Sequence, residues 1–306
     1  MHDTGPPVFL PPDLISDIEL FSTPTNLWHM NSIKPLWTLV TGKGIKVAIL
    51  DTGVNSHDVL PEPIEARSFI QGESWRDGNG HGTHCSGTVL GRDGIGLAPD
   101  ASLIFGKVLS NSGNGSSEGI AQGINWAVET GADIISMSLG SNSPYQPMQD
   151  ALKYAWSKGV IVLSAAGNAG FNGKNNTIGY PAKYPESLCI GASRLDGNRG
   201  SFSSGGREMD IVCPGEDIIS CSTRNGYVSM TGTSMATPFS AGLFALILEL
   251  QRREGYAAWE NVEAVRAFLA ANTEDKGTPG RDSSWGFGIP KYSDIVNKLN
   301  NATLSF

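Results

Sequence analysis

The chain has 306 residues, a length that admits one large α/β domain or two smaller ones. It carries 22 Lys and Arg against 30 Asp and Glu, a net charge of −8 that disfavours nucleic acid or an anionic membrane as the main partner. Hydrophobic residues make up 40%, which argues against a disordered, charge-rich chain. The longest apolar run, residues 241–248, is far shorter than the roughly 20 residues that span a bilayer, so we expect no membrane-spanning helix.

The cysteines and the N-terminus favour a cytoplasmic location. Four cysteines are too few for a disulfide scaffold and lack metal-binding spacing, so we expect free, buried thiols. The first 14 residues hold four prolines and have neither the basic start nor the apolar core of a secretory signal. A secreted protein is the alternative if this chain is a trimmed mature form.

The first 40 residues differ from the rest of the chain. They contain six prolines and the segment VFLPPDLISDIELF, which predicts an extended arm that leads into a short helix. We therefore divide the chain into an N-terminal arm or short propeptide, residues 1–40, and a single domain, residues 41–306.

Beyond the arm, short apolar runs alternate with helix-like segments, as in a doubly wound α/β fold with a mainly parallel sheet. The runs are continuously apolar, which predicts strands covered on both faces. Strands are expected at residues 45–50, 103–109, 133–139, 160–166 and 188–192, and helices at residues 81–90, 116–130, 144–158, 234–253 and 259–271.

Three polar residues stand where a strand ends or a helix begins. Asp51 follows the strand IKVAIL, His81 lies between two glycines in GNGHGTHCSG, and Ser234 precedes an apolar helix in MTGTSMATP. Each alone has a plainer interpretation, as a turn Asp, a structural His or a helix-capping Ser. His81 and His84 could also bind a metal, although their spacing lacks the Glu of the HExxH pattern.

Together these segments resemble the subtilisin-like serine proteases, over about residues 37–288. The order Asp, His, Ser is that of the family, with DTG at Asp51, HGTH at His81, GTSMATP at Ser234 and AAGN ending at Asn168. The resemblance implies that Ser234 attacks the peptide carbonyl and His81 takes its proton. Asp51 would orient His81, and Asn168 with the backbone N–H of Ser234 would bind the oxyanion.

The resemblance also implies an extended substrate-binding groove. Two chain segments would pair with the substrate backbone, and backbone pairing accepts almost any unfolded segment. The main pocket would have Gly179 at its base, which leaves room for a large apolar or aromatic side chain. The implied substrate-binding residues are Gly113, Asn114, Gly115, Ser117, Ile120, Ser138, Leu139, Gly140, Ala165, Ala166, Gly167 and Gly179.

Many relatives bind calcium tightly near the DTG segment, but this chain has Val59 at the position of the ligand Asp and a shortened loop in TVLGRDGIGLAP. We therefore expect this calcium site to be absent, and no cofactor to be required for catalysis. A weaker site for Na⁺ or Ca²⁺ is implied by the resemblance at four positions. They are Ala182, Tyr184, Ser187 and Asp210.

Two further features follow from the resemblance. Cys85, directly after the HGTH motif, would lie beneath His81, as in the proteinase K and thermitase branches, or be an inert buried thiol. The short arm resembles that of the intracellular subtilisins, where such an extension can lie across the active site and restrain it. The chain's own arm is therefore a candidate inhibitor.

We interpret the chain as a serine endopeptidase that cleaves extended polypeptides after large apolar or aromatic residues. One alternative is a restrained pseudo-protease that binds peptides without cutting them. An α/β-hydrolase is disfavoured, because GTSMA is not GxSxG and the residue order differs.

Overall fold

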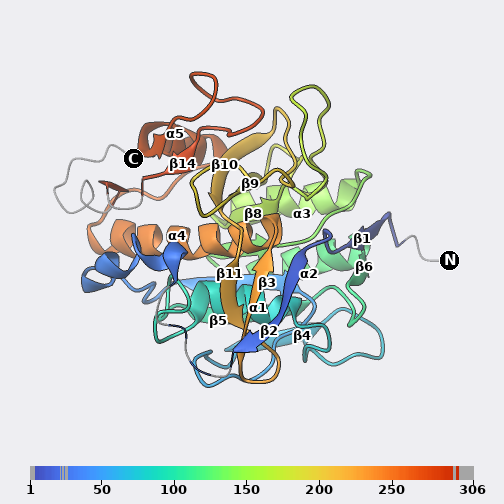
Figure 1. Ribbon diagram of the computed structural model, residues 1–306. Helices are drawn as coiled ribbons and strands as arrows, with labels where there is room; N and C mark the ends of the chain where they lie inside the picture. Colours follow the sequence, from blue (N-terminus) through green and yellow to red (C-terminus); the bar gives the residue numbers. More distant parts are fainter. Residues whose placement is uncertain (1–3, 21, 23, 25–26, 292–293, 296–306) are drawn as a thin grey trace.

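The fold, seen in a computed structural model, is built around one seven-stranded parallel sheet (Figure 1). The structure describes residues 4–291 except 21, 23, 25 and 26, together with residues 294 and 295. The strand order is β10-β9-β8-β7-β3-β5-β4. In that order the strands are Met209–Pro214, Leu188–Ser193, Ile161–Ala165, Ile134–Met137, Lys46–Asp51, Ser102–Lys107 and Glu65–Ser68.

The strands are apolar throughout because both faces of the sheet are covered. In β3, Val47 and Ile49 belong to one buried cluster, whereas Ala48 and Leu50 belong to another on the opposite face. Helices α1 (His81–Leu90) and α4 (Thr233–Arg253) pack on the first face, and α2 (Ser117–Glu129) and α3 (Gln146–Ser157) on the second. The predicted doubly wound, mainly parallel α/β fold is thus confirmed.

Helix α4 is the only helix among the described residues that is long and apolar enough to cross a bilayer. However, 94% of its most apolar 18-residue window is buried inside the protein. Its apolar surface is therefore used in packing against the central sheet and α1.

The N-terminal region contributes two strands outside the main sheet. Strand β1 (Pro7–Phe9) pairs antiparallel with β6 (Asn114–Ser116), and β2 (Leu14–Leu20) pairs with β12 (Tyr227–Thr231). Strand β12 also pairs with β11 (Ile218–Cys221), so that the blue β2 in Figure 1 runs beside the orange strands that lead to α4.

The second half of the expected arm belongs to the body of the domain. The short 3₁₀ helices Trp28–Met30 and Lys34–Thr38 follow β2, and Met30, Ile33 and Leu36 are buried in the main core. Their spacing of three residues puts them on one side of the chain, facing the core. Leu27 is also buried in this core, so the arm outside the core comprises only residues before Leu27.

The C-terminal region adds helix α5 (Val262–Asn272) and a two-stranded sheet of β13 (Thr273–Glu274) and β14 (Ile289–Pro290). Asn261 caps α5 by accepting a hydrogen bond from the Ala264 N–H. The carboxyl ends of β3, β7 and β8 meet at one edge of the central sheet, where the predicted functional residues gather.

Candidate active site

Asp51 and His81 are held together where β3 ends and α1 begins. Oδ1 of Asp51 lies 2.8 Å from Nδ1 of His81 and also accepts a hydrogen bond from the Thr52 N–H at 2.7 Å. Both side chains are buried, at 0% and 5% exposure. The short turn after a parallel strand thus delivers the carboxylate directly to the first residue of the neighbouring helix.

Asp77 fixes this junction, although the sequence analysis did not single it out. Its Oδ1 accepts hydrogen bonds from the Thr52 hydroxyl and from the N–H groups of Asn79 and Gly80, all at 2.9–3.0 Å. Its Oδ2 accepts from the N–H and the hydroxyl of Thr83 at 2.9 and 2.6 Å. One buried carboxylate therefore ties the turn after Asp51 to the N-terminus of α1, a position that favours negative charge.

Ser234 lies in the first turn of α4 and is fully buried. Its Oγ has no hydrogen-bond partner among the described residues, whereas its carbonyl accepts a 2.7 Å bond from the Ser138 hydroxyl. The Cys85 thiol also reaches this carbonyl, at 3.6 Å, and lies 3.8 Å from Nδ1 of His81. Cys85 is therefore beneath the histidine, where the resemblance placed it.

Asn168 follows β8 and is oriented by Thr233. Its Oδ1 accepts hydrogen bonds from both the N–H and the hydroxyl of Thr233, each at 2.9 Å. This arrangement fixes the amide so that its Nδ2 donors face the site. Thr233 is a positioning residue that the sequence analysis did not identify, since a Thr beside the Ser has no distinctive pattern.

The pKa values of the ionisable groups of α1 are shifted in different directions. Burial lowers the pKa of His81, but Asp51, Cys85 and Asp13 more than offset it, so the pKa is raised well above 6.5. Burial lowers the pKa of His84 to about 3, and its Nε2 lies 2.9 Å from the Ile218 carbonyl. Burial raises the pKa of the Cys85 thiol to about 11. His84 is thus a neutral structural residue.

The expected substrate-binding segments surround the N-terminal arm. On one side, Phe9 forms two backbone hydrogen bonds with Gly140, at 3.0 and 2.9 Å. On the other side, Val8 pairs with Gly115 in the β1–β6 ladder, and Leu10 donates to the carbonyl of Gly113 at 3.1 Å. The arm therefore lies as a strand between the two edges that the resemblance assigned to an extended substrate.

An apolar pocket receives the side chain of Val8. This side chain is 1% exposed and belongs to the same buried cluster as Ile120 and Leu139. Ser117 lies at the start of α2 beside it and is fully buried. Val8 is thus buried in the cluster that contains two residues expected to line the second pocket, and the role of this pocket in substrate binding stays a prediction.

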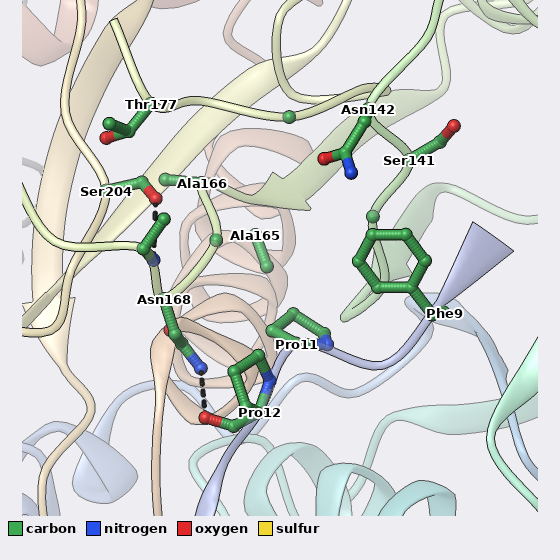
Figure 2. A pocket seen from close by; sticks show the side chains of 14 residues that line it. Phe9, Pro11, Pro12, Ser141, Asn142, Ala165, Ala166, Asn168, Thr177 and Ser204 are labelled. Carbon is green, nitrogen blue, oxygen red and sulfur yellow. Dashed lines mark hydrogen bonds between the residues drawn. The ribbon is translucent and has the colours of Figure 1, made fainter. Parts of the chain in front are cut away.

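A second hollow, of about 130 Å³, opens beside the arm (Figure 2). Pro11 and Pro12 lie along one side of it, and Figure 2 shows Ala165 and Ala166 above them and the Asn168 amide beside Pro12, joined to it by a hydrogen bond. Its remaining wall includes the positions expected for the main specificity pocket. These are Gly140, Gly167 and Gly179, with Ser141, Asn142, Thr177 and Ser204 beside them.

The carboxylate of Asp13 reaches the centre of the site. Its Oδ2 lies 3.1 Å from Nε2 of His81, and its Oδ1 accepts a 2.6 Å hydrogen bond from Nδ2 of Asn168. The same amide also donates to the Pro12 carbonyl, at 3.4 Å. The carboxylate of Asp13 therefore contacts both Nε2 of His81 and Nδ2 of Asn168. The Asp13 side chain is only 5% exposed.

Two of the four positions expected for a weak cation site, Ser187 and Asp210, are in contact with arginine side chains. Asp210 is fully buried, and its Oδ1 accepts hydrogen bonds from Arg266 at 2.9 Å and Arg281 at 2.8 Å. Arg266 also donates to the Ser187 carbonyl at 3.2 Å, and the Cys189 N–H donates to Oδ2 of Asp210 at 2.9 Å. Two guanidinium groups thus supply positive charge beside Asp210, and the weak cation site expected at Ala182, Tyr184, Ser187 and Asp210 stays a prediction.

Where relatives bind calcium tightly, Asp58 of this chain is bonded to an asparagine side chain. Asp58 accepts a 2.9 Å hydrogen bond from Nδ2 of Asn225, and Val59 beside it is buried. The absence of calcium here stays a prediction.

Comparison with known proteins agrees with this geometry. The model of the Subtilase family matches residues 42–288. Subtilisin DY of Bacillus licheniformis is 45% identical over 212 residues, which cover 68% of this chain and 77% of that protein. Subtilisin Savinase of Lederbergia lenta is 43% identical over 229 residues, 73% of this chain and 81% of that protein. Alkaline elastase YaB of Bacillus sp. (strain YaB) is 40% identical over 255 residues, 81% of this chain and 65% of that protein. The chain therefore belongs to the subtilase family and is a subtilisin-like serine endopeptidase.

Proposed function

We propose that this endopeptidase is held in a self-inhibited form by its own N-terminal arm, residues 4–20. The observation that carries the proposal is the position of Asp13, whose carboxylate bonds to both His81 and Asn168. In this arrangement Nε2 of His81 is engaged by Asp13 and is not available to take the proton of Ser234. The arm also pairs with the two chain segments that we expect to bind an extended substrate.

Once the arm leaves, the same residues have the chemistry for acyl transfer. His81 takes the Ser234 hydroxyl proton as the oxygen attacks the peptide carbonyl, and Asp51 stabilises the imidazolium that forms. The Asn168 amide, already oriented by Thr233, donates to the oxyanion. His81 then returns the proton to the leaving amine, and water repeats the sequence to release the acyl group.

We infer that the preferred substrates are extended polypeptides with a large apolar residue before the cleaved bond. The hollow of about 130 Å³ beside Pro11 and Pro12 is lined by alanine, glycine, proline, Phe9 and uncharged polar residues, and has no charged side chain in its lining. Such a lining offers little to a charged residue but accepts apolar surface. The relatives' names support polypeptide substrates in general.

The cytosolic location expected from the thiols gains no support from the relatives' names and stays a prediction.

Covalent labelling tests the self-inhibited form. A fluorophosphonate should label the full chain slowly, and the variant Val8→Asp at least tenfold faster, because a carboxylate in the apolar pocket would unseat the arm. Intact mass spectrometry would report a single adduct, and Ser234→Ala is the control that should give none. Equal rates for the wild type and Val8→Asp would contradict inhibition by the arm. No adduct in either would favour the pseudo-protease, which binds peptides without cutting them.

A further inference from the structure

The arm makes contacts beyond the two pockets, at the first turn of α2. The carbonyl of Pro6 accepts hydrogen bonds from both the N–H and the hydroxyl of Ser117, at 3.1 and 2.8 Å. The carbonyl of Thr4 accepts one from the N–H of Glu118, at 3.2 Å. These N–H groups belong to the first turn of a helix and have no partner within it. They bind backbone carbonyls, which every polypeptide has.

Tyr145 forms the other wall of this surface. Its ring lies against Gly5, so closely that a Cβ added there would be 2.8 Å from two ring carbons. Two hydrogen bonds hold Tyr145 in place. The ring hydroxyl donates to Glu118 at 3.0 Å, and the backbone N–H of Tyr145 donates to the Tyr184 hydroxyl at 2.6 Å. Gly5 also has a φ of +65°, which L residues other than glycine rarely adopt. The ring and the backbone conformation of residue 5 therefore together favour glycine at this position.

This surface continues the substrate groove without a break. Pro7, the next residue of the arm, already pairs with Ser116 in the β1–β6 ladder, and Ser116 is also the residue that caps α2. Val8 then enters the apolar pocket. From Thr4 to Leu10, backbone hydrogen bonds or ladder pairs join the arm to the groove.

We propose that the first turn of α2 and the Tyr145 ring form an outer subsite for polypeptide substrates. The outer subsite, made of Ser117, Glu118 and Tyr145, binds the substrate backbone two to four residues before the side chain in the apolar pocket, and it selects glycine three residues before it. The inference rests on the proposed function, because it treats Thr4–Pro6 as lying where a substrate would lie.

A pair of fluorogenic peptides measures the contribution of the outer subsite. The short peptide carries Val-Phe-Leu-Phe before the fluorogenic amide, and the long peptide carries Thr-Gly-Pro-Pro in front of the same four residues. With the arm unseated by Val8→Asp, we expect kcat/KM to be about tenfold higher for the long peptide, since it adds three hydrogen bonds. A long peptide with Gly replaced by Ala should lose most of this advantage.

Two substitutions at one residue separate the donors. In the Val8→Asp chain, Ser117→Ala removes only the hydroxyl and should lower the long-to-short ratio a few-fold. Ser117→Pro removes the N–H as well and should bring the ratio close to one. Proline is tolerated at the first helical position, and Ser116 before it has the extended backbone that a following proline requires (φ −121°, ψ 148°). Ser157→Ala, at the exposed end of α3, is the matched control and should leave the ratio unchanged.

The outcomes separate this inference from the proposed function. A ratio near one in Val8→Asp itself would overturn the outer subsite even where the short peptide is cut rapidly. A high ratio that persists in Ser117→Pro would equally overturn the assignment to α2. A wild-type chain as active as Val8→Asp would instead overturn inhibition by the arm, and the ratio measured on that chain would still decide the outer subsite.

Discussion

Asp13 and His81, 68 residues apart in the sequence, meet at 3.1 Å in a site where each side chain is 5% exposed. The contact is strongest when His81 is protonated, because a carboxylate then faces an imidazolium. The general-base role proposed for His81 requires the neutral imidazole instead. The same proton therefore favours the closed arm and opposes the chemistry.

Inhibition by the arm should weaken as the pH rises. Asp13 is among the groups that raise the pKa of His81, so protonation favours the arm-bound form. This stabilisation is complete below the pKa of His81 with the arm released. It is lost from there up to the higher pKa with the arm bound, a window that extends above pH 6.5.

The ratio of fluorophosphonate labelling rates, Val8→Asp over wild type, measures this inhibition at each pH and cancels the titration of His81 in the open form. We expect the ratio to fall by up to about tenfold per pH unit across the window. In the chain with Asp13→Asn, the corresponding ratio should be smaller and nearly independent of pH. A wild-type ratio that stays flat would contradict a role for the His81 proton.

Removal of the Asp77 carboxylate should destabilise the protein. Asp77→Ala leaves five donors without their acceptor, several of them buried, and we expect a loss of about 3 kcal/mol in the free energy of unfolding. Asp77→Asn keeps one acceptor oxygen and should lose less. Urea unfolding measures both, with Asp150→Ala as the control, since that side chain is 61% exposed. A loss no larger than in the control would show that other contacts hold the start of α1.

The guanidinium of Arg266 should replace a bound cation. Arg266→Ala leaves the buried Asp210 short of positive charge, at an expected cost of about 3 kcal/mol, whereas Arg281→Ala should cost less because that side chain is 31% exposed. Added Na⁺ or Ca²⁺ should raise the melting temperature of Arg266→Ala and leave that of the wild type unchanged. A wild type that is itself stabilised by Ca²⁺, relative to equal ionic strength, would show that a cation site exists in this chain.

The thiol of Cys85 should resist alkylation but respond to mercury. Its pKa of about 11 leaves on the order of one thiol in a thousand ionised at pH 8, so iodoacetamide should not modify the folded protein. A bulky mercurial that binds Sγ, 3.8 Å from His81, should displace the imidazole and abolish labelling of Ser234 in Val8→Asp. Cys85→Ala in the same background should be insensitive. Full labelling with Cys85 shown to be modified would contradict this role.

The sequence alone identifies the family, five of the seven strands of the central sheet and the four candidate residues Asp51, His81, Asn168 and Ser234. Apolar runs mark buried strands, and short motifs with fixed neighbours mark the residues at their ends, so both signals are local in the chain. The predicted helix at residues 81–90 coincides with α1, and the others differ from the observed helices by at most a few residues at their ends. Strand β4 and strand β10 were not predicted, because their segments lack a long apolar run or follow irregular loops.

The surroundings of those four residues depend on contacts between distant parts of the chain. The arm is held largely by backbone pairing with the groove, which leaves little trace in its side chains, and Asp13 reaches His81 only because β1 and β2 fix both ends of the segment between them. In the sequence, Asp77 looks like any aspartate in a turn. Its role is visible only in the folded protein, where it bonds to both the turn after Asp51 and the start of α1. Likewise, the charge on Asp210 is balanced by arginines 56 and 71 residues away, a pairing that depends on the packing of α5 and the C-terminal loop.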